Sequence, residues 1–281
     1  MNEDHTASDW VDARGDKWRA HLPGLEALLA PTDEPLLSAL QLDAPCRVAD
    51  IGCGSGGTAL EILRRAPRGT IVHGFDISPT MIEAARARVP HEELSIAFEV
   101  ADMATAAVRE EPYHRLSSRF GVMFFEAPHA AFSNLLRWLA PGGQFAFAVW
   151  GQPADNPWMT AVRDVVADTV DLPPPDPDGP GPFRYAEADK LIGLLEGADF
   201  TEIDVSRWRG ALPMGGRLPP AEAAHFALAS FSSFAEQLAR AGSDAFDAAH
   251  RALTARLGRH QHNGAVWMDA SIYILAGTRS H

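Results

Sequence analysis

The chain has 281 residues, 46% of them hydrophobic, which is enough for one large α/β domain or one domain with a sizeable insertion. Its 37 acidic residues outnumber 24 lysines and arginines, and a net charge of −13 disfavours DNA or structured RNA as a partner. No run of about 18 apolar residues predicts a membrane span. The polar N-terminus and two cysteines, interpreted as reduced thiols, favour a cytoplasmic protein.

Strands and helices alternate along the first half of the chain. Leucines between Leu25 and Leu40 recur at helical spacing, so helices are expected within residues 1–45. Apolar strands are predicted at 47–51, 70–75, 94–100, 115–120 and 144–150, with helices at 58–65, 79–89 and 128–139. This alternation predicts a parallel sheet with helices on both faces.

The pattern loosens after residue 150. A Pro/Gly-rich loop at 172–182 precedes a helix at 187–196, a sixth strand at 200–208, two alanine-rich helical stretches within 219–258 and a last strand at 266–276. The expected division is an N-terminal helical lid (1–45), a Rossmann-like core (46–210), a helical insertion (211–262) and a final strand within 263–281. The insertion is expected to be a lid or a dimer contact.

A glycine-rich stretch, GCGSGG at residues 52–57, directly follows the first strand. Glycines let the backbone turn sharply and approach a ligand, and the next helix points its N-terminal N–H groups at that ligand. A strand–helix turn without a ligand is the plain alternative. No Gly-Lys-Ser/Thr follows, so a Walker A loop is excluded, and a dinucleotide or S-adenosylmethionine remains.

Three carboxylates at successive strand ends favour S-adenosylmethionine. Asp50 can bind the ammonium of a methionine moiety, whereas it would repel a dinucleotide pyrophosphate. Asp76 can bind two ribose hydroxyls, and Asp102 can accept a hydrogen bond from the adenine amine while Met103 packs on the ring. An ordinary helix cap is the alternative for Asp76 and for Asp102.

These motifs resemble those of class I S-adenosylmethionine-dependent methyltransferases. VADIGCGSG is similar to the family's first motif, GFDIS to its second and ADM to its third, and the likeness extends over about residues 46–210. The chain most resembles the small-molecule enzymes of the ubiquinone/menaquinone-biosynthesis group, and RGDKW near the N-terminus fits them too. The resemblance implies a Rossmann-like α/β fold with a seven-stranded sheet whose last strand is antiparallel. The predicted cofactor-binding residues are Asp50, Gly52, Cys53, Gly54, Gly56, Asp76, Ile77, Asp102, Met103, Ser118 and Trp18.

The methyl acceptor is expected beyond the carboxyl ends of the fourth and fifth strands. His129, at the start of the helix after the fourth strand, is the candidate general base, with an exposed first-turn histidine as the alternative. No metal site is predicted, because His260 and His262 lack a carboxylate or cysteine partner nearby. The predicted pocket residues are Phe120, Met123, Phe124, Trp150, Trp158 and His225, with core packing as the alternative for Phe124. His225, on the expected lid helix, is also a second candidate base.

The sequence therefore predicts an enzyme that uses S-adenosylmethionine to methylate a small apolar or aromatic metabolite, with secondary metabolism as its setting. A protein that binds S-adenosylmethionine but catalyses a non-methylating reaction, such as a cyclisation, is one alternative. An NAD-dependent oxidoreductase is the other. Neither nucleic acid nor membrane is expected as a partner, and a homodimer is left open.

Overall fold

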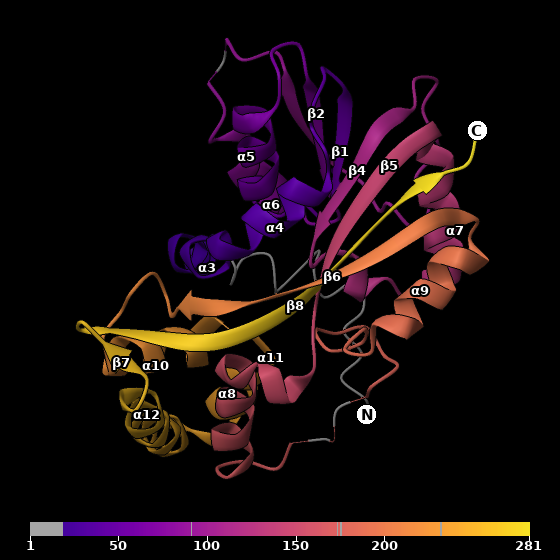
Figure 1. Ribbon diagram of the computed structural model, residues 1–281. Coiled ribbons are helices and arrows are strands. Elements are labelled where there is room, and N and C mark those ends of the chain that lie inside the picture. Colours follow the sequence, from indigo (N-terminus) through magenta and orange to yellow (C-terminus); the bar gives the residue numbers. More distant parts are fainter. Residues whose placement is uncertain (1–18, 91, 173, 175, 231) are drawn as a thin grey trace.

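A single twisted sheet runs through the molecule in the order β3-β2-β1-β4-β5-β8-β6 (Figure 1). The computed structural model describes residues 19–90, 92–172, 174, 176–230 and 232–281. The strands are β1 (Arg47–Ile51), β2 (Ile71–Asp76), β3 (Ile96–Val100), β4 (Tyr113–Arg119), β5 (Leu139–Trp150), β6 (Phe200–Pro213) and β8 (Ala265–Arg279), with β7 (Gln261–His262) paired to β8 off this path. Strands β1 to β5 pair in parallel, and β8 is antiparallel to both β5 and β6. The predicted fold class is confirmed.

Helices cover both faces of the sheet, as the alternation predicted. On one face, Phe98 contacts the glycine loop that opens α5; on the other, Phe75 and Phe147 meet the aromatic rings of Trp138 and Phe132 in α7. The helices are α3 (Leu22–Leu29), α4 (Asp33–Ala39), α5 (Gly57–Arg65), α6 (Pro79–Arg86), α7 (Pro128–Trp138), α8 (Pro157–Ala167), α9 (Ala188–Gly197), α10 (Pro220–Ser230), α11 (Ser232–Ala241) and α12 (Ser243–Gly258), with short 3-10 turns η2 (Ala30–Thr32), η3 (Val122–Phe124) and η4 (Pro153–Asp155).

Strand β5 starts five residues earlier than the sequence predicted, at Leu139 rather than residue 144. The segment Pro141-Gly142-Gly143, expected to separate helix from strand, lies inside it. The pairing with β4 jumps from Tyr113–Leu139 to Arg115–Gln144, so the extra residues are absorbed in a bulge. A turn-like sequence can therefore lie within a strand when the partner strand tolerates the shift in register.

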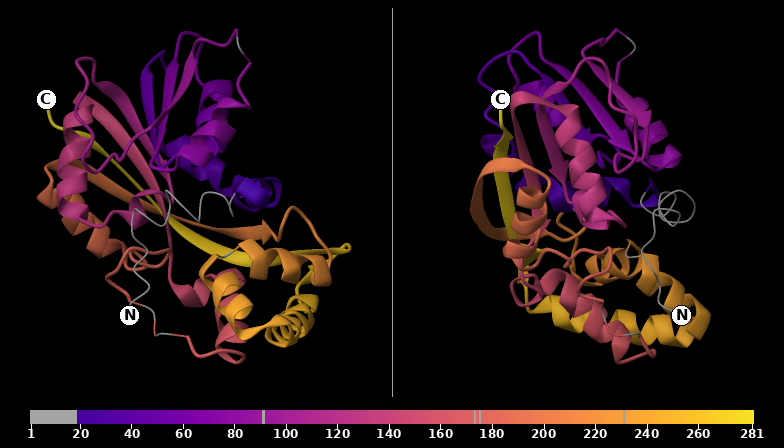
Figure 2. Two further views of the ribbon diagram at one scale, coloured as in Figure 1. Left: turned by 180° about the vertical axis from the view of Figure 1, so that it is seen from behind. Right: turned by 90° about the vertical axis from the view of Figure 1, so that its right-hand side faces the viewer.

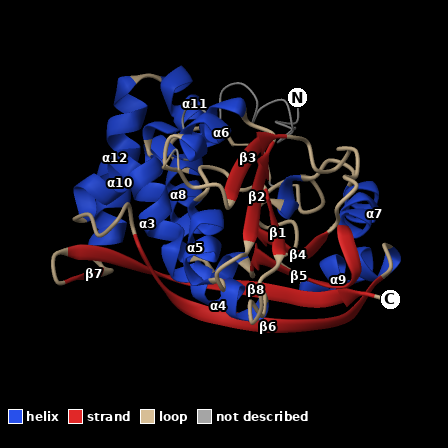
Figure 3. Cartoon of the chain, turned by 90° about the horizontal axis from the view of Figure 1, so that it is seen from above, coloured by secondary structure: helices blue, strands red, loops and turns tan. Residues whose placement is uncertain are grey.

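Strands β6 and β8 run well past the core, with 14 and 15 residues. Their pairing continues to Pro213–Trp267, whereas β5 leaves the sheet at the Trp150–Ile272 pair. The free part forms a two-stranded ribbon, and α8 and the helices α10–α12 pack beside it (Figures 1 and 2). Figure 3 shows these helices and the α7–α9 pair at opposite ends of the long strands β6 and β8.

Two sequence predictions in this region need correction. Residues 219–258 form three helices rather than two, and residues 157–167 form α8, which was not predicted. Pro157 at the first position of α8 is a helix-start signal that the sequence analysis did not use. Across the described ranges no helix is both long and apolar enough to cross a membrane, and Cys46 and Cys53 are free thiols.

Candidate functional site

The loop after β1 depends on its glycines for two separate reasons. Gly52, Gly54 and Gly56 all have left-handed backbone angles, with φ of +65°, +54° and +80°. A Cβ at Gly56 would lie 2.5 Å from the ring of Phe98, whereas one at Gly54 would meet only the end of the Met81 side chain, at 3.7 Å. The loop is therefore tightly packed underneath and open at Gly54.

Gly52 touches a second glycine that the sequence analysis did not single out. A Cβ at Gly52 would lie 2.8 Å from the Cα of Gly121, and a Cβ at Gly121 would lie 2.7 Å from the carbonyl oxygen of Ile51. These residues follow β1 and β4, the adjacent strands at which the order of the sheet reverses. Ligands of open α/β sheets bind at such a switch point.

Asp50, the first predicted cofactor residue, lies at the end of β1 and is 1% exposed. Within the described chain, neither of its carboxylate oxygens has a hydrogen-bond partner, and neither has the hydroxyl of Ser117. The two residues pair across β1 and β4. Burial raises the pKa of Asp50 to about 7, against the opposing effects of the Arg119 charge and of the Ser117 hydroxyl, which lies nearby without hydrogen-bond geometry. A buried carboxylate without a partner is costly unless a cation joins it.

Asp76, at the end of β2, holds the glycine loop in place. Its carboxylate accepts hydrogen bonds from the backbone N–H of Gly54 (2.8 Å) and of Ser78 (2.9 Å). Burial raises its pKa even so, against the effect of those bonds. An ionised carboxylate offers about four acceptor positions, so Asp76 can still accept two hydroxyl donors.

Asp102 caps the turn after β3. Its carboxylate accepts from the backbone N–H of Ala104 (3.0 Å) and the hydroxyl of Thr105 (2.9 Å). The capping alternative therefore describes what Asp102 does within the chain, and spare acceptor positions remain on both oxygens. Asp50, Asp76 and Asp102 lie at the carboxyl ends of three neighbouring strands, as their spacing predicted.

The remaining predicted cofactor residues lie around this edge at different depths. Ser118 is buried, and its hydroxyl donates to a β1 carbonyl at 2.7 Å. Cys53 and Met103 are buried, and Ile77 is partly exposed. Trp18 lies outside the described residues. Between Ser117 and Ser118, the free hydroxyl belongs to Ser117, which shares the sheet face of Asp50.

The N-terminal helices reach the loop through charges that the sequence analysis missed. Glu26 of α3 accepts a hydrogen bond from the Ser55 hydroxyl at 2.5 Å and forms ion pairs with Arg88 (3.2 Å) and Arg119 (3.6 Å). Burial alone would raise the pKa of Glu26, but these partners hold it below its ordinary value. Arg119 also pairs with Asp33 at 3.0 Å. These residues are up to 93 positions apart, so no local motif could reveal them.

Negative charge predominates around the loop. Burial also raises the pKa of Asp33, against the effects of Arg119 and Thr58. The charged side chains that bond to the loop, or lie under it or in ion pairs beside it, include Glu26, Asp33, Asp50, Asp76, Arg88 and Arg119. Four carboxylates against two guanidinium groups leave a surplus that a cationic ligand would balance.

The acceptor side, where β4 and β5 end, is aromatic and closed. Phe120 has a left-handed φ of +66°, unusual for a bulky residue, and stacks on Trp150 with ring centroids 4.0 Å apart. Trp150 in turn packs on Trp158 at 4.8 Å. Those three residues and Met123 are buried, as core packing would also require, while Phe124 is partly exposed.

The two candidate histidines contact helices rather than strand ends. His129 is exposed, and its imidazole Nε2 would lie 3.7 Å from a Cβ placed on Gly197, at the end of α9. His225 is exposed on α10, with its ring 5.7 Å from that of Phe246. Their roles stay predictions.

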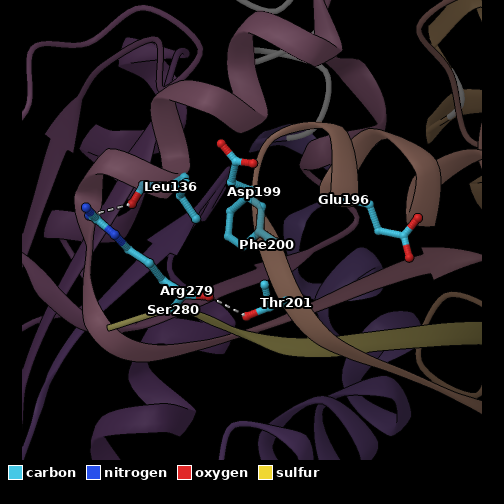
Figure 4. A pocket seen from close by; sticks show the side chains of 7 residues that line it. All are labelled: Leu136, Glu196, Asp199, Phe200, Thr201, Arg279 and Ser280. Atoms are coloured by element: carbon cyan, nitrogen blue, oxygen red, sulfur yellow. Dashed lines mark hydrogen bonds between the residues drawn. The ribbon is translucent and has the colours of Figure 1, made fainter.

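A surface cavity of about 410 Å³ lies at the opposite edge of the sheet, where β6 begins and β8 ends (Figure 4). Its lining residues are Leu136, Glu196, Asp199, Phe200, Thr201, Arg279 and Ser280. The Arg279 guanidinium donates to the carbonyl of Leu136 at its wall. This cavity does not belong to the glycine-loop site, which lies at the carboxyl edge.

Comparison with known proteins finds sequence similarity to methyltransferases over the first part of the core. Residues 48–143 match the family model described as methyltransferase domain. A trans-aconitate 2-methyltransferase of Methylobacterium nodulans is 39% identical over 112 residues, covering 40% of this chain and 41% of that protein. A demethylmenaquinone methyltransferase of Deinococcus radiodurans is 32% identical over 113 residues, covering 40% and 46%. The chain thus spans less than half the length of these curated relatives.

The fold likeness extends further than the sequence likeness. The structure of Haemonchus contortus phosphoethanolamine N-methyltransferase 2 in complex with S-adenosyl-L-methionine has a TM-score of 0.58, with 17% identity, and covers 98% of this chain and 60% of that chain. The family match ends at residue 143, within β5, and includes the glycine loop and its three strand-end carboxylates.

Proposed function

We propose, on the premise that residues 48–143 match the methyltransferase-domain family model, that the whole protein is a class I S-adenosylmethionine-dependent methyltransferase acting on a small apolar or aromatic metabolite. One observation carries the proposal: Asp50 is a buried carboxylate, without a partner in the described chain, beneath an open glycine loop. A ligand with an ammonium group and a sulfonium centre supplies the positive charge that this site lacks.

The described residues fit that cofactor. In the proposal Asp50 binds the ammonium, Asp76 accepts from the ribose hydroxyls and Asp102 accepts from the adenine amine, with Met103 beside the ring. Gly54 leaves room for close approach of the ligand to the backbone. When bound, S-adenosylmethionine supplies a methyl group on a sulfonium centre, which a nucleophile of the acceptor can attack.

The chain contributes alignment and exclusion of water at the reacting centre. The buried stack of Phe120, Trp150 and Trp158 offers an apolar surface beside the switch point, which suits an acceptor with an apolar or aromatic body. Alignment and dehydration lower the barrier of a methyl transfer more than any single side chain does. The proposal assigns no proton-transfer step to His129, because its described contact is with α9.

Contacts of α3 support a lid. On one side Glu26 is bonded to the glycine loop; on the other, a Cβ at Gly24 would lie 2.5 Å from the ring of Phe226 in α10. His21 also meets Phe226 edge to face, with ring centroids 6.2 Å apart. Because α3 contacts both the glycine loop and α10 of the insertion, a movement of one on ligand binding would move the other, as in a lid that closes over a site.

Calorimetric titration with S-adenosylmethionine, S-adenosylhomocysteine and NAD tests the proposal. We expect saturable binding of the first two and none of NAD. Binding of NAD alone would overturn it in favour of an oxidoreductase. Release of S-adenosylhomocysteine during turnover, followed by mass spectrometry, separates methyl transfer from a non-methylating reaction that leaves the cofactor intact.

A further inference from the structure

Unpartnered buried polar atoms point to places where a ligand completes the structure. In the described part of the chain these side-chain atoms belong to Arg47, Asp50, Ser117, Gln144, Tyr185 and Thr254. Asp50 and Ser117 belong to the edge of the sheet that carries the glycine loop and the three strand-end carboxylates, which we call the cofactor edge. Tyr185 is the member of this set that lies beside the loops after β4 and β5. The methyl acceptor is expected there, and we call this region the acceptor edge.

Tyr185 is held between those two loops by its neighbours in sequence. Arg184 donates a hydrogen bond to the carbonyl of Phe125, in the loop after β4. The side-chain amide of Gln152, in the loop after β5, donates to the carbonyl of Ala186 at 3.1 Å. The residues on each side of Tyr185 are therefore bonded to the loops after β4 and β5, although Tyr185 itself lies in the long connection between α8 and α9.

The hydroxyl of Tyr185 is the unusual part of this residue. Its side chain is 1% exposed, and within the described chain no group bonds its oxygen. The other fully buried tyrosine, Tyr113, has its hydroxyl 2.6 Å from Nδ1 of His73. A buried phenol without a hydrogen-bond partner lowers the stability of the folded protein. A ligand atom that accepts its hydrogen bond would remove this penalty, which favours binding. Burial raises the pKa of Tyr185 to about 12, so the group stays protonated and can donate.

We propose that Tyr185 binds the methyl-accepting substrate by donating a hydrogen bond from its phenolic hydroxyl to an oxygen atom of that substrate. The acceptor is then an aromatic or apolar compound that carries a carbonyl, ether or phenol oxygen, with its body against the aromatic side chains at the ends of β4 and β5. This inference rests on the proposed function, and it makes Tyr185 a residue that determines specificity.

The test uses 4-nitrophenol as a probe, titrated calorimetrically into the protein saturated with S-adenosylhomocysteine. In Tyr185→Phe the dissociation constant of the probe should rise about three- to tenfold, the loss expected for one neutral hydrogen bond. The affinity for S-adenosylhomocysteine should not change. Tyr113→Phe is the matched control: it should lower the melting temperature, because its hydroxyl is bonded, and leave the affinity for the probe unchanged.

Equal affinity of wild type and Tyr185→Phe for the probe would overturn the inference, as would the absence of saturable probe binding to wild type. A melting temperature of Tyr185→Phe that falls as far as that of Tyr113→Phe would assign the hydroxyl to a structural bond, and would also overturn it. Failure of wild type to bind S-adenosylhomocysteine is a different result, because it contradicts the proposed function itself.

Discussion

The cofactor edge and the acceptor edge lie on adjacent strands, yet they are built differently. The first comes largely from the end of β1 and the short stretch after it, with three left-handed glycines and the Asp50 carboxylate, which lacks a partner in the described chain. The second combines the ends of β4 and β5 with residues 181–186, and its rings pack on one another. A preformed polar edge suits a cofactor that stays the same among related enzymes. An edge assembled from distant segments can differ in sequence between enzymes that bind different methyl acceptors.

The largest effect that would break the cofactor edge is expected from Gly52→Ala. The new Cβ would require a left-handed alanine and would lie 2.8 Å from the Cα of Gly121, a backbone atom that cannot move aside by itself. We expect the free energy of unfolding to fall by about 3 kcal/mol, measured by urea unfolding.

Gly54→Ala is the control for that substitution. Its φ is also left-handed, but its Cβ would meet only a flexible side-chain end at 3.7 Å. It should cost about 1 kcal/mol, the backbone part alone. Equal losses for the two variants would show that contact between the β1 and β4 loops is not what makes Gly52 necessary.

Asp50→Asn should separate cofactor affinity from stability. Loss of the charge-assisted contact should weaken S-adenosylhomocysteine binding about thirty- to hundredfold, since such contacts contribute about 2–3 kcal/mol. Asp102→Asn, at a carboxylate already bonded by the chain, is the control and should lose less. Equal losses at both positions would contradict the role given to Asp50.

The same substitution predicts how stability depends on pH. The pKa of Asp50 is about 7 in the folded chain against 3.8 as the ordinary value, so folding favours its protonated form. Without cofactor, its contribution should destabilise the protein increasingly from about pH 4 to pH 7, by about 4 kcal/mol at most. Urea unfolding at pH 5 and pH 8 should show a smaller decrease for Asp50→Asn than for wild type. A decrease of the same size would show that Asp50 is paired or hydrated in the folded protein.

Asp76→Ala is expected to have a smaller effect on affinity, about tenfold for S-adenosylhomocysteine, because hydroxyl donors are neutral. The variant also removes the acceptor for the backbone N–H groups of Gly54 and Ser78, so part of the loss comes from the loop itself. Asp76→Asn keeps one acceptor oxygen and should recover some affinity. Unchanged affinity in both variants would remove Asp76 from the cofactor site.

The sequence could predict where the glycines and strand-end carboxylates of the proposed cofactor site lie, because these constraints are local. A strand, three glycines and an acid at each of three strand ends follow from the residues of each segment, and the order of the sheet brings them together. Glu26 and Arg119 could not be found in this way, because their ion-pair partners lie in distant segments. Tyr185 could not be found either, because its place depends on the bonds that its neighbours form with Phe125 and Gln152. The bulge in β5 and the length of β6 and β8 escaped for the same reason: pairing with a neighbouring strand overrode local turn signals.

His129→Ala gives the smallest expected effect, and it tests whether the acceptor edge extends to the start of α7. The histidine is exposed and its imidazole lies toward Gly197, so its loss should change the free energy of unfolding by less than about 0.5 kcal/mol. Affinity for S-adenosylhomocysteine and turnover should both stay near wild type, measured by calorimetry and by product formation. A large fall in turnover with unchanged cofactor affinity would instead make His129 the general base. The acceptor edge would then extend to the start of α7, and α9 would have to move for the imidazole to reach the acceptor.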